Sequence, residues 1–136
     1  MSRINTYVRQ HEQIQEIAEE ILDIINLNTL QQNSDNVRRL LARLAGNIKL
    51  HLTIEDESLY PDLLGDTDEK VSGTAKKFKD EMGDINTKFG EYIMKWRTAR
   101  QIEESNSGFA DETIKLFSVI FKRIEKENKE LYPLVA

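Results

Sequence analysis

Residues 51–61 read HLTIEDESLYP, and residues 123–133 read RIEKENKELYP. Both segments place a glutamate five residues before a Tyr-Pro pair. Four residues before that glutamate stands His51 in one segment and Arg123 in the other. Side chains at positions i and i+4 of a helix lie on one face, one turn apart. The first segment therefore predicts a helix with a His-Glu pair on one face. It should end or bend at its proline, because proline disfavours the α conformation of the preceding residue.

The rest of the chain repeats apolar residues at alternating intervals of four and three, the spacing of an inward helix face. Four stretches show this spacing, over residues 5–26, 34–60, 71–96 and 109–132. Residues 97–108 are polar and are predicted to form a flexible loop. Helices of similar length with short connections favour an antiparallel up-down-up-down four-helix bundle. We therefore predict an all-α fold with a single domain over residues 1–136.

The composition narrows the class of protein. The chain has no cysteine, which excludes disulfides, thiolate metal sites and cysteine nucleophiles. Acidic and basic residues are mixed, with a net charge of −5, so we expect no nucleic-acid partner, which would favour a basic patch. No apolar stretch resembles a signal peptide or approaches the length of a transmembrane helix. We expect a cytoplasmic protein without membrane association.

Polar residues on the predicted inward faces gather near the end marked by the two Tyr-Pro pairs. An up-down topology makes the second and fourth helices parallel, which brings Glu127 level with Glu55. His11, on the inward face of the first helix, and Met82, on that of the third, are expected at a comparable depth. These placements predict one cluster that contains His11, His51, Glu55 and Glu127.

The donor types in this cluster match a metal site. Imidazole and carboxylate ligands from facing helices of a bundle suit iron, manganese or zinc. Four such ligands can hold one ion. The two histidines of the whole chain are few for a histidine-rich dinuclear centre.

The tyrosines of the two segments, Tyr60 and Tyr132, are predicted to pack at one end of the bundle. Tyrosine commonly places its ring against apolar neighbours and its hydroxyl in water. Neither residue is assigned a part in the site.

These features together resemble the hemerythrin-like family, also called HHE cation-binding domains, over nearly the whole chain. The resemblance rests on a histidine in the first helix, a His-x3-Glu before Leu-Tyr-Pro in the second, and a glutamate before Leu-Tyr-Pro-Leu in the fourth. It implies a four-helix bundle and, in members with a complete site, a non-haem di-iron centre that interacts with dioxygen. The resemblance places family ligands at His11, His51, Glu55 and Glu127.

Two positions depart from the family pattern. The family has one or two histidines on the third helix, where this chain has Glu81 and Met82. It also has a histidine on the fourth helix, where this chain has Arg123. Arginine has no lone pair to offer a metal, and a thioether is a poor partner for iron. We therefore do not expect oxygen carriage at a di-iron centre of the usual type.

Two functions remain open at this point. In the first, the four residues bind one iron, manganese or zinc ion in a sensing or storage role, with Glu81 as an additional oxygen ligand. In the second, the bundle is a metal-free regulatory or protein-interaction module, and Arg123 neutralises the former ligands Glu55 and Glu127. Burying an unpaired carboxylate costs free energy. The carboxylates therefore need a cation, which is the metal ion in the first function and the guanidinium of Arg123 in the second. We expect no enzyme activity, because no catalytic constellation is present in the sequence.

Overall fold

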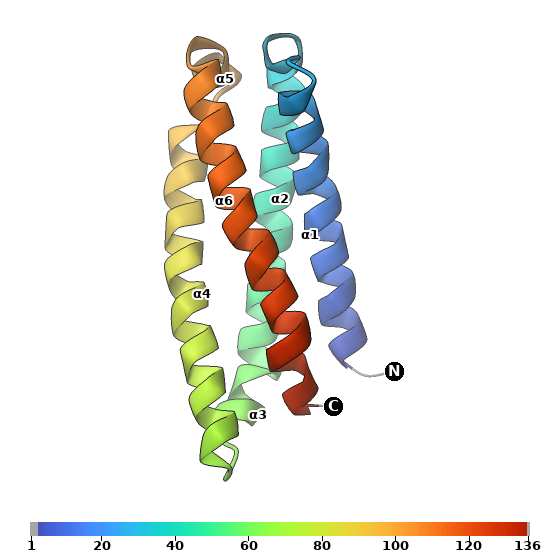
Figure 1. Cartoon of the computed structure of the whole chain (residues 1–136), viewed down its shortest axis with the longest axis vertical. Helices are drawn as coiled ribbons and strands as arrows, with labels where there is room; N and C mark the ends of the chain where they lie inside the picture. The colour runs from blue at the N-terminus through green and yellow to red at the C-terminus, as the bar shows by residue number, and fades with distance from the viewer. Residues whose placement is uncertain (1–2, 136) are drawn as a thin grey trace.

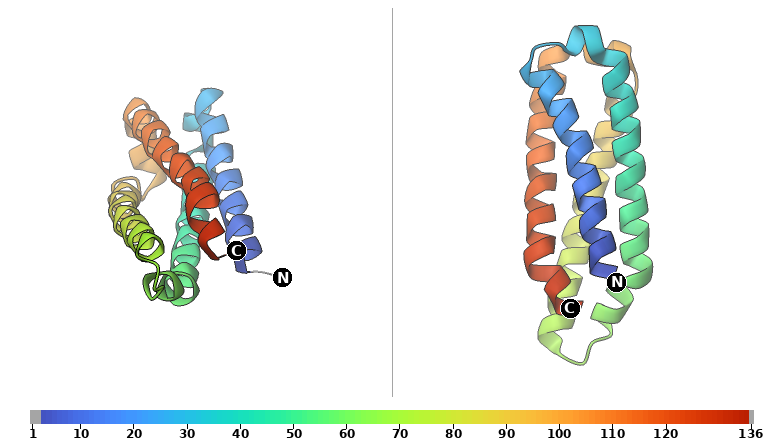
Figure 2. Two further views of the ribbon diagram at one scale, coloured as in Figure 1. Left: turned by 60° about the horizontal axis from the view of Figure 1, so that its bottom comes forward. Right: turned by 90° about the vertical axis from the view of Figure 1, so that its right-hand side faces the viewer.

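The structure is a computed structural model that describes residues 3–135. Four long helices dominate it, and consecutive ones run in opposite directions along the molecule (Figures 1 and 2). These helices are α1 (Arg3–Asn26), α2 (Leu30–Ser58), α4 (Glu69–Lys95) and α6 (Asn106–Lys126). No strand is found among the described residues. The predicted all-α helical bundle is confirmed.

The first connection is shorter than the sequence predicts. Asn28 has a φ of 61°, a left-handed conformation that asparagine tolerates and that commonly ends a helix. α2 then begins at Leu30, four residues before the predicted start. Its backbone leaves helical geometry at Asn33, with φ −119° and ψ 15°. The predicted boundary thus appears as a kink inside a longer helix.

The second connection follows the prediction. α2 ends at Ser58, and α3 (Tyr60–Leu64) carries Pro61 in its first turn, where proline's missing N–H is not needed. The side chain of Asp68 then accepts a hydrogen bond of 2.9 Å from the backbone N–H of Lys70 and caps α4. Proline therefore follows the end of the long helix where the sequence indicated, and the aspartate cap starts the next one.

The predicted flexible loop over residues 97–108 is wrong. This segment contains α5 (Ala99–Glu104), and α6 already begins at Asn106. Thr98 and Gln101 form a capping box in which each side chain bonds the backbone N–H of the other residue. Ile102 is fully buried and anchors the short helix on the core. A single apolar residue was too weak a periodic signal to predict this helix.

The C-terminal end departs from regular α-helix. η1 (Glu127–Leu131) is a π-helical turn, and η2 (Tyr132–Val135) is a 3₁₀ turn. The backbone N–H of Tyr132 donates to the carbonyl oxygen of Glu127, five residues earlier. Single π turns are uncommon and often occur at functional sites.

Apolar side chains form two core clusters. The larger one includes Ile14, Ile48 and Ile124, and the smaller one at the other end includes Tyr7 and Leu131. His11, His51, Glu55 and Glu127 lie along their helices between the apolar residues of the larger cluster and those of the smaller one. They therefore lie between the two clusters. None of the helices within residues 3–135 combines the length and apolar character needed to cross a bilayer.

Candidate metal centre

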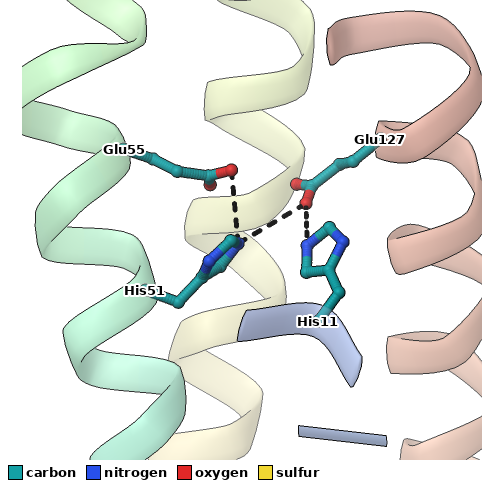
Figure 3. Close-up of side chains that lie close together, drawn as sticks. All are labelled: His11, His51, Glu55 and Glu127. Atoms are coloured by element: carbon teal, nitrogen blue, oxygen red, sulfur yellow. Dashed lines mark hydrogen bonds and ion pairs between the residues drawn. The ribbon is translucent and has the colours of Figure 1, made fainter. Parts of the chain in front are cut away.

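The four polar residues that were predicted to face inward come together in the bundle (Figure 3). His11 is on α1, His51 and Glu55 are on α2, and Glu127 is the first residue of η1. Each has an exposed fraction of at most 4%. One potential ligand atom from each residue lies within 4.8 Å of the others. The intervals of four and three residues, which define the inward helix faces, thus predicted that these residues lie close together.

Both imidazole rings turn their Nε2 atoms toward the carboxylates (Figure 3). His11 Nε2 lies 3.0 Å from Oε1 of Glu127. His51 Nε2 lies 3.2 Å from Oε2 of Glu55 and 4.0 Å from Oε1 of Glu127. The two nitrogens and the two carboxylates therefore converge from three segments of the chain.

The opposite nitrogen of each ring is held by a side-chain amide. His11 Nδ1 donates to Oδ1 of Asn128 at 2.8 Å, and His51 Nδ1 donates to Oε1 of Gln10 at 2.7 Å. An amide oxygen only accepts, so the hydrogen is placed on Nδ1 in both rings. This is the arrangement that orients histidines in metal sites, because it leaves Nε2 to face the ion.

The sequence interpretation missed Gln10 and Asn128. Each directly adjoins one residue of the cluster but bonds a histidine on another helix. Their adjacency to His11 and Glu127 was visible in the sequence. The cross-helix pairing was not, because it depends on the rotation of each helix about its axis.

A proton on His51 offsets part of the negative charge of the cluster in the metal-free protein. Burial alone would lower the pKa of His51, but the carboxylates of Glu127 and Glu55, at 4.0 and 3.2 Å from its Nε2, outweigh it and raise this pKa to about 9. Burial likewise favours neutral Glu127, but hydrogen bonds and positive charges from His11 and His51 lower the pKa of Glu127. His51 therefore carries a proton at neutral pH, beside an ionised Glu127.

Two carboxylate oxygens lack partners. Glu55 Oε1 and Glu127 Oε2 are buried and accept no hydrogen bond within the described residues. A buried anion needs a cation or donors, so these oxygens favour an ion in the cluster. Donors held at about 2.1 Å in a tetrahedral site lie about 3.4 Å apart. The four donor atoms lie within 4.8 Å of one another, so the widest separation would close by roughly 1.4 Å around a single ion.

A small cavity of about 20 Å³ adjoins the cluster. His11, His51 and Glu127 line it, together with Met82 and Arg123. This volume suffices for about one water-sized species. Met82 thus lies at the depth that the sequence predicted for it.

Arg123 does not take the place expected of it. The guanidinium lies over the Phe78 ring, 4.7 Å from its centre, and its Nη2 is 3.4 Å from Oε1 of Glu81. No ion pair between Arg123 and either Glu55 or Glu127 is found among residues 3–135. Glu81 is likewise drawn to Arg123 and is outside the four-residue group. The expected neutralisation by Arg123 and the expected extra ligand Glu81 are therefore both contradicted by the geometry.

The prediction that Tyr60 and Tyr132 point their hydroxyls at water is wrong. Both residues are buried, at 2% and 1% exposure. The Tyr132 hydroxyl donates to Oε2 of Glu55 at 2.6 Å, whereas the Tyr60 hydroxyl has no hydrogen-bond partner among the described residues. Burial, reinforced by the negative charges of Glu127 and Glu55, raises the pKa of both phenols. Both are therefore neutral in the metal-free protein.

Comparison with known proteins identifies the chain's family. A family model described as Hemerythrin HHE cation binding domain matches residues 2–135, essentially the whole chain. No curated protein and no solved structure gives a significant match.

Proposed function

The chain belongs to the hemerythrin HHE cation-binding family, and we propose that it binds one metal ion in a sensing or storage role. The ion is iron, manganese or zinc, and its proposed protein ligands are His11, His51, Glu55 and Glu127. The observation that carries this proposal is the buried convergence of four donor atoms within 4.8 Å of one another.

The charges of the four residues support a divalent ion. Two carboxylates and two neutral imidazoles sum to two negative charges, which a divalent ion offsets in a buried place. The unpartnered oxygens of Glu55 and Glu127 would gain a cation, and the proton on His51 would leave. When bound, a redox-active ion would supply sensitivity to oxidants, which is the chemistry that a sensor needs.

Oxygen carriage at a di-iron centre is not part of the proposal. A histidine-rich dinuclear site needs more imidazoles than the two in this chain. The position on α6 where the family has a histidine holds Arg123, which pairs with Glu81. A second ion therefore lacks ligands next to the first.

A metal-free regulatory or protein-interaction bundle is the second candidate. The raised pKa of His51 favours it, since an imidazolium beside Glu55 and Glu127 can stabilise the cluster without a metal. The cation in this alternative is a proton on His51 and not the guanidinium of Arg123.

Metal loading separates the two candidates. The purified protein is incubated in turn with Fe(II), Mn(II) and Zn(II), excess ion is removed, and bound metal is counted. We expect one retained ion per chain, its loss in His51→Ala, and its retention in the control Glu81→Gln. The absence of retained metal under all three conditions, and after loading with Fe(III) as well, would support the metal-free bundle.

A further inference from the structure

We propose that Tyr132 supplies a fifth protein donor, its phenol oxygen, to the metal ion, and that this donor makes the site favour Fe(III). The inference rests on the proposed metal site and adds a ligand that is neither histidine nor carboxylate.

The Tyr132 hydroxyl lies among the other donor atoms. It is 2.6 Å from Oε2 of Glu55, 3.0 Å from Nε2 of His11 and 3.4 Å from Nε2 of His51. Neighbouring donors bound to one ion at about 2.1 Å are separated by roughly 3.0–3.4 Å. The oxygen of Tyr132 is therefore already close to the spacing of ligands that share an ion.

The π turn explains why this tyrosine reaches the cluster. In an α-helix, residues five apart point about 140° away from each other, so Tyr132 would leave the face that carries Glu127. The i→i+5 hydrogen bond of η1 widens the turn and places Tyr132 one turn beyond Glu127. The ring is then fixed by stacking on His11 at 5.4 Å between ring centres and by Tyr7 at 5.2 Å.

Charge balance selects the ion. Glu55, Glu127 and a deprotonated Tyr132 together carry three negative charges, which a trivalent ion offsets and a divalent ion does not. Tyrosine oxygen is an established ligand of protein-bound iron. As Tyr132 joins the ion, its O–H bond breaks and one proton leaves to solvent. No change of oxidation state is needed when Fe(III) is supplied.

Visible spectroscopy tests the proposal. The protein is loaded with Fe(III) supplied as its citrate complex, freed of excess, and examined for a visible phenolate-to-iron(III) charge-transfer band together with an iron count. We expect the band in the unaltered protein and its complete loss in Tyr132→Phe, with iron still retained. Tyr60→Phe is the matched control, because Tyr60 is equally buried near the cluster but bonds none of its members. It should keep the band.

Each outcome decides the proposal. Iron retained without the band, or a band that persists in Tyr132→Phe, overturns ligation by Tyr132 and leaves the four-residue site standing. No retained metal at all overturns the metal site and the tyrosine ligand together.

If Tyr132→Phe does not fold, resonance Raman spectra of the unaltered protein must show enhanced tyrosinate modes. Those modes must also persist in Tyr7→Phe, Tyr60→Phe and Tyr92→Phe; their absence, or their loss in one of these variants, overturns the assignment.

Discussion

The hydroxyl of Tyr132 donates to Oε2 of Glu55 at 2.6 Å, and so joins the two copies of the repeated segment. The copies are equivalent in sequence but not in structure. Tyr60 follows Glu55 by five residues, as Tyr132 follows Glu127, yet the Tyr60 hydroxyl has no hydrogen-bond partner within residues 3–135. The difference follows from the π turn, which occurs only at the second copy in the described part of the chain.

Metal affinity should depend on pH through His51. The metal-free protein holds a proton on this residue with a pKa of about 9, and an ion must displace it. Between pH 6 and pH 8 the affinity for Zn(II) should therefore rise about tenfold per pH unit for each displaced proton. Titration calorimetry in a series of buffers measures this slope. An affinity independent of pH would mean that Nε2 of His51 is not a donor.

The stability of the metal-free protein should show the opposite trend at high pH. The pKa of His51 is raised from 6.5 to about 9 by folding, so its contribution is fully present below pH 6.5 and is lost as pH rises through 9. The loss is on the order of 3 kcal/mol in the free energy of unfolding. Urea denaturation with a chelator at pH 6 and pH 10 measures it. The His51→Gln variant should flatten the profile, and an equally steep profile in this variant would contradict the assignment to His51.

The amide that orients His11 should matter for metal binding. Asn128→Ala removes the acceptor of the Nδ1 hydrogen, and loss of such a partner typically weakens metal affinity about ten- to a hundredfold. Competition with a zinc indicator measures the change. Lys129→Ala, next in the chain and exposed, is the matched control and should leave the affinity unchanged. Equal effects of the two variants would show that Asn128 acts only through general stability.

Arg123 should be dispensable for the metal. Its guanidinium contacts Glu81 and Phe78, so Arg123→Met should retain one ion with an affinity close to that of the unaltered protein. The variant should lose about 1 kcal/mol of stability from the cation–π contact and a partly exposed ion pair. Metal counting and urea denaturation check both statements. A large gain in metal affinity would instead indicate that Arg123 occupies the place of the ion.

The positions of the cluster residues were predictable because they depend on helical periodicity alone. His11, His51, Glu55 and Glu127 all fall on inward faces, and their convergence required only the register of parallel and antiparallel helices. The family resemblance assigned the same four residues. Their service as ligands stays a prediction until metal is measured.

Other features of the site could not be predicted from the sequence. The π turn at Glu127 could not be predicted, because Pro133 indicates that the helix ends or bends but Pro61 follows an equivalent segment without a π turn. Arg123 lies at the edge of its inward face, and the side on which it finds a partner depends on the position of α4. A repeat in the sequence indicates similar helices but does not determine similar hydrogen bonds at their ends.

We propose above all that His11, His51, Glu55 and Glu127 share one ion. A crystal structure of the metal-loaded protein, with anomalous scattering at the absorption edge of the metal, tests it directly. We predict one anomalous peak per chain at about 2.0–2.1 Å from Nε2 of both histidines, with an oxygen of each glutamate at about 2.0–2.2 Å. A peak elsewhere, or both Nε2 atoms still against the carboxylates in a protein loaded with metal, would show that these four residues do not share an ion.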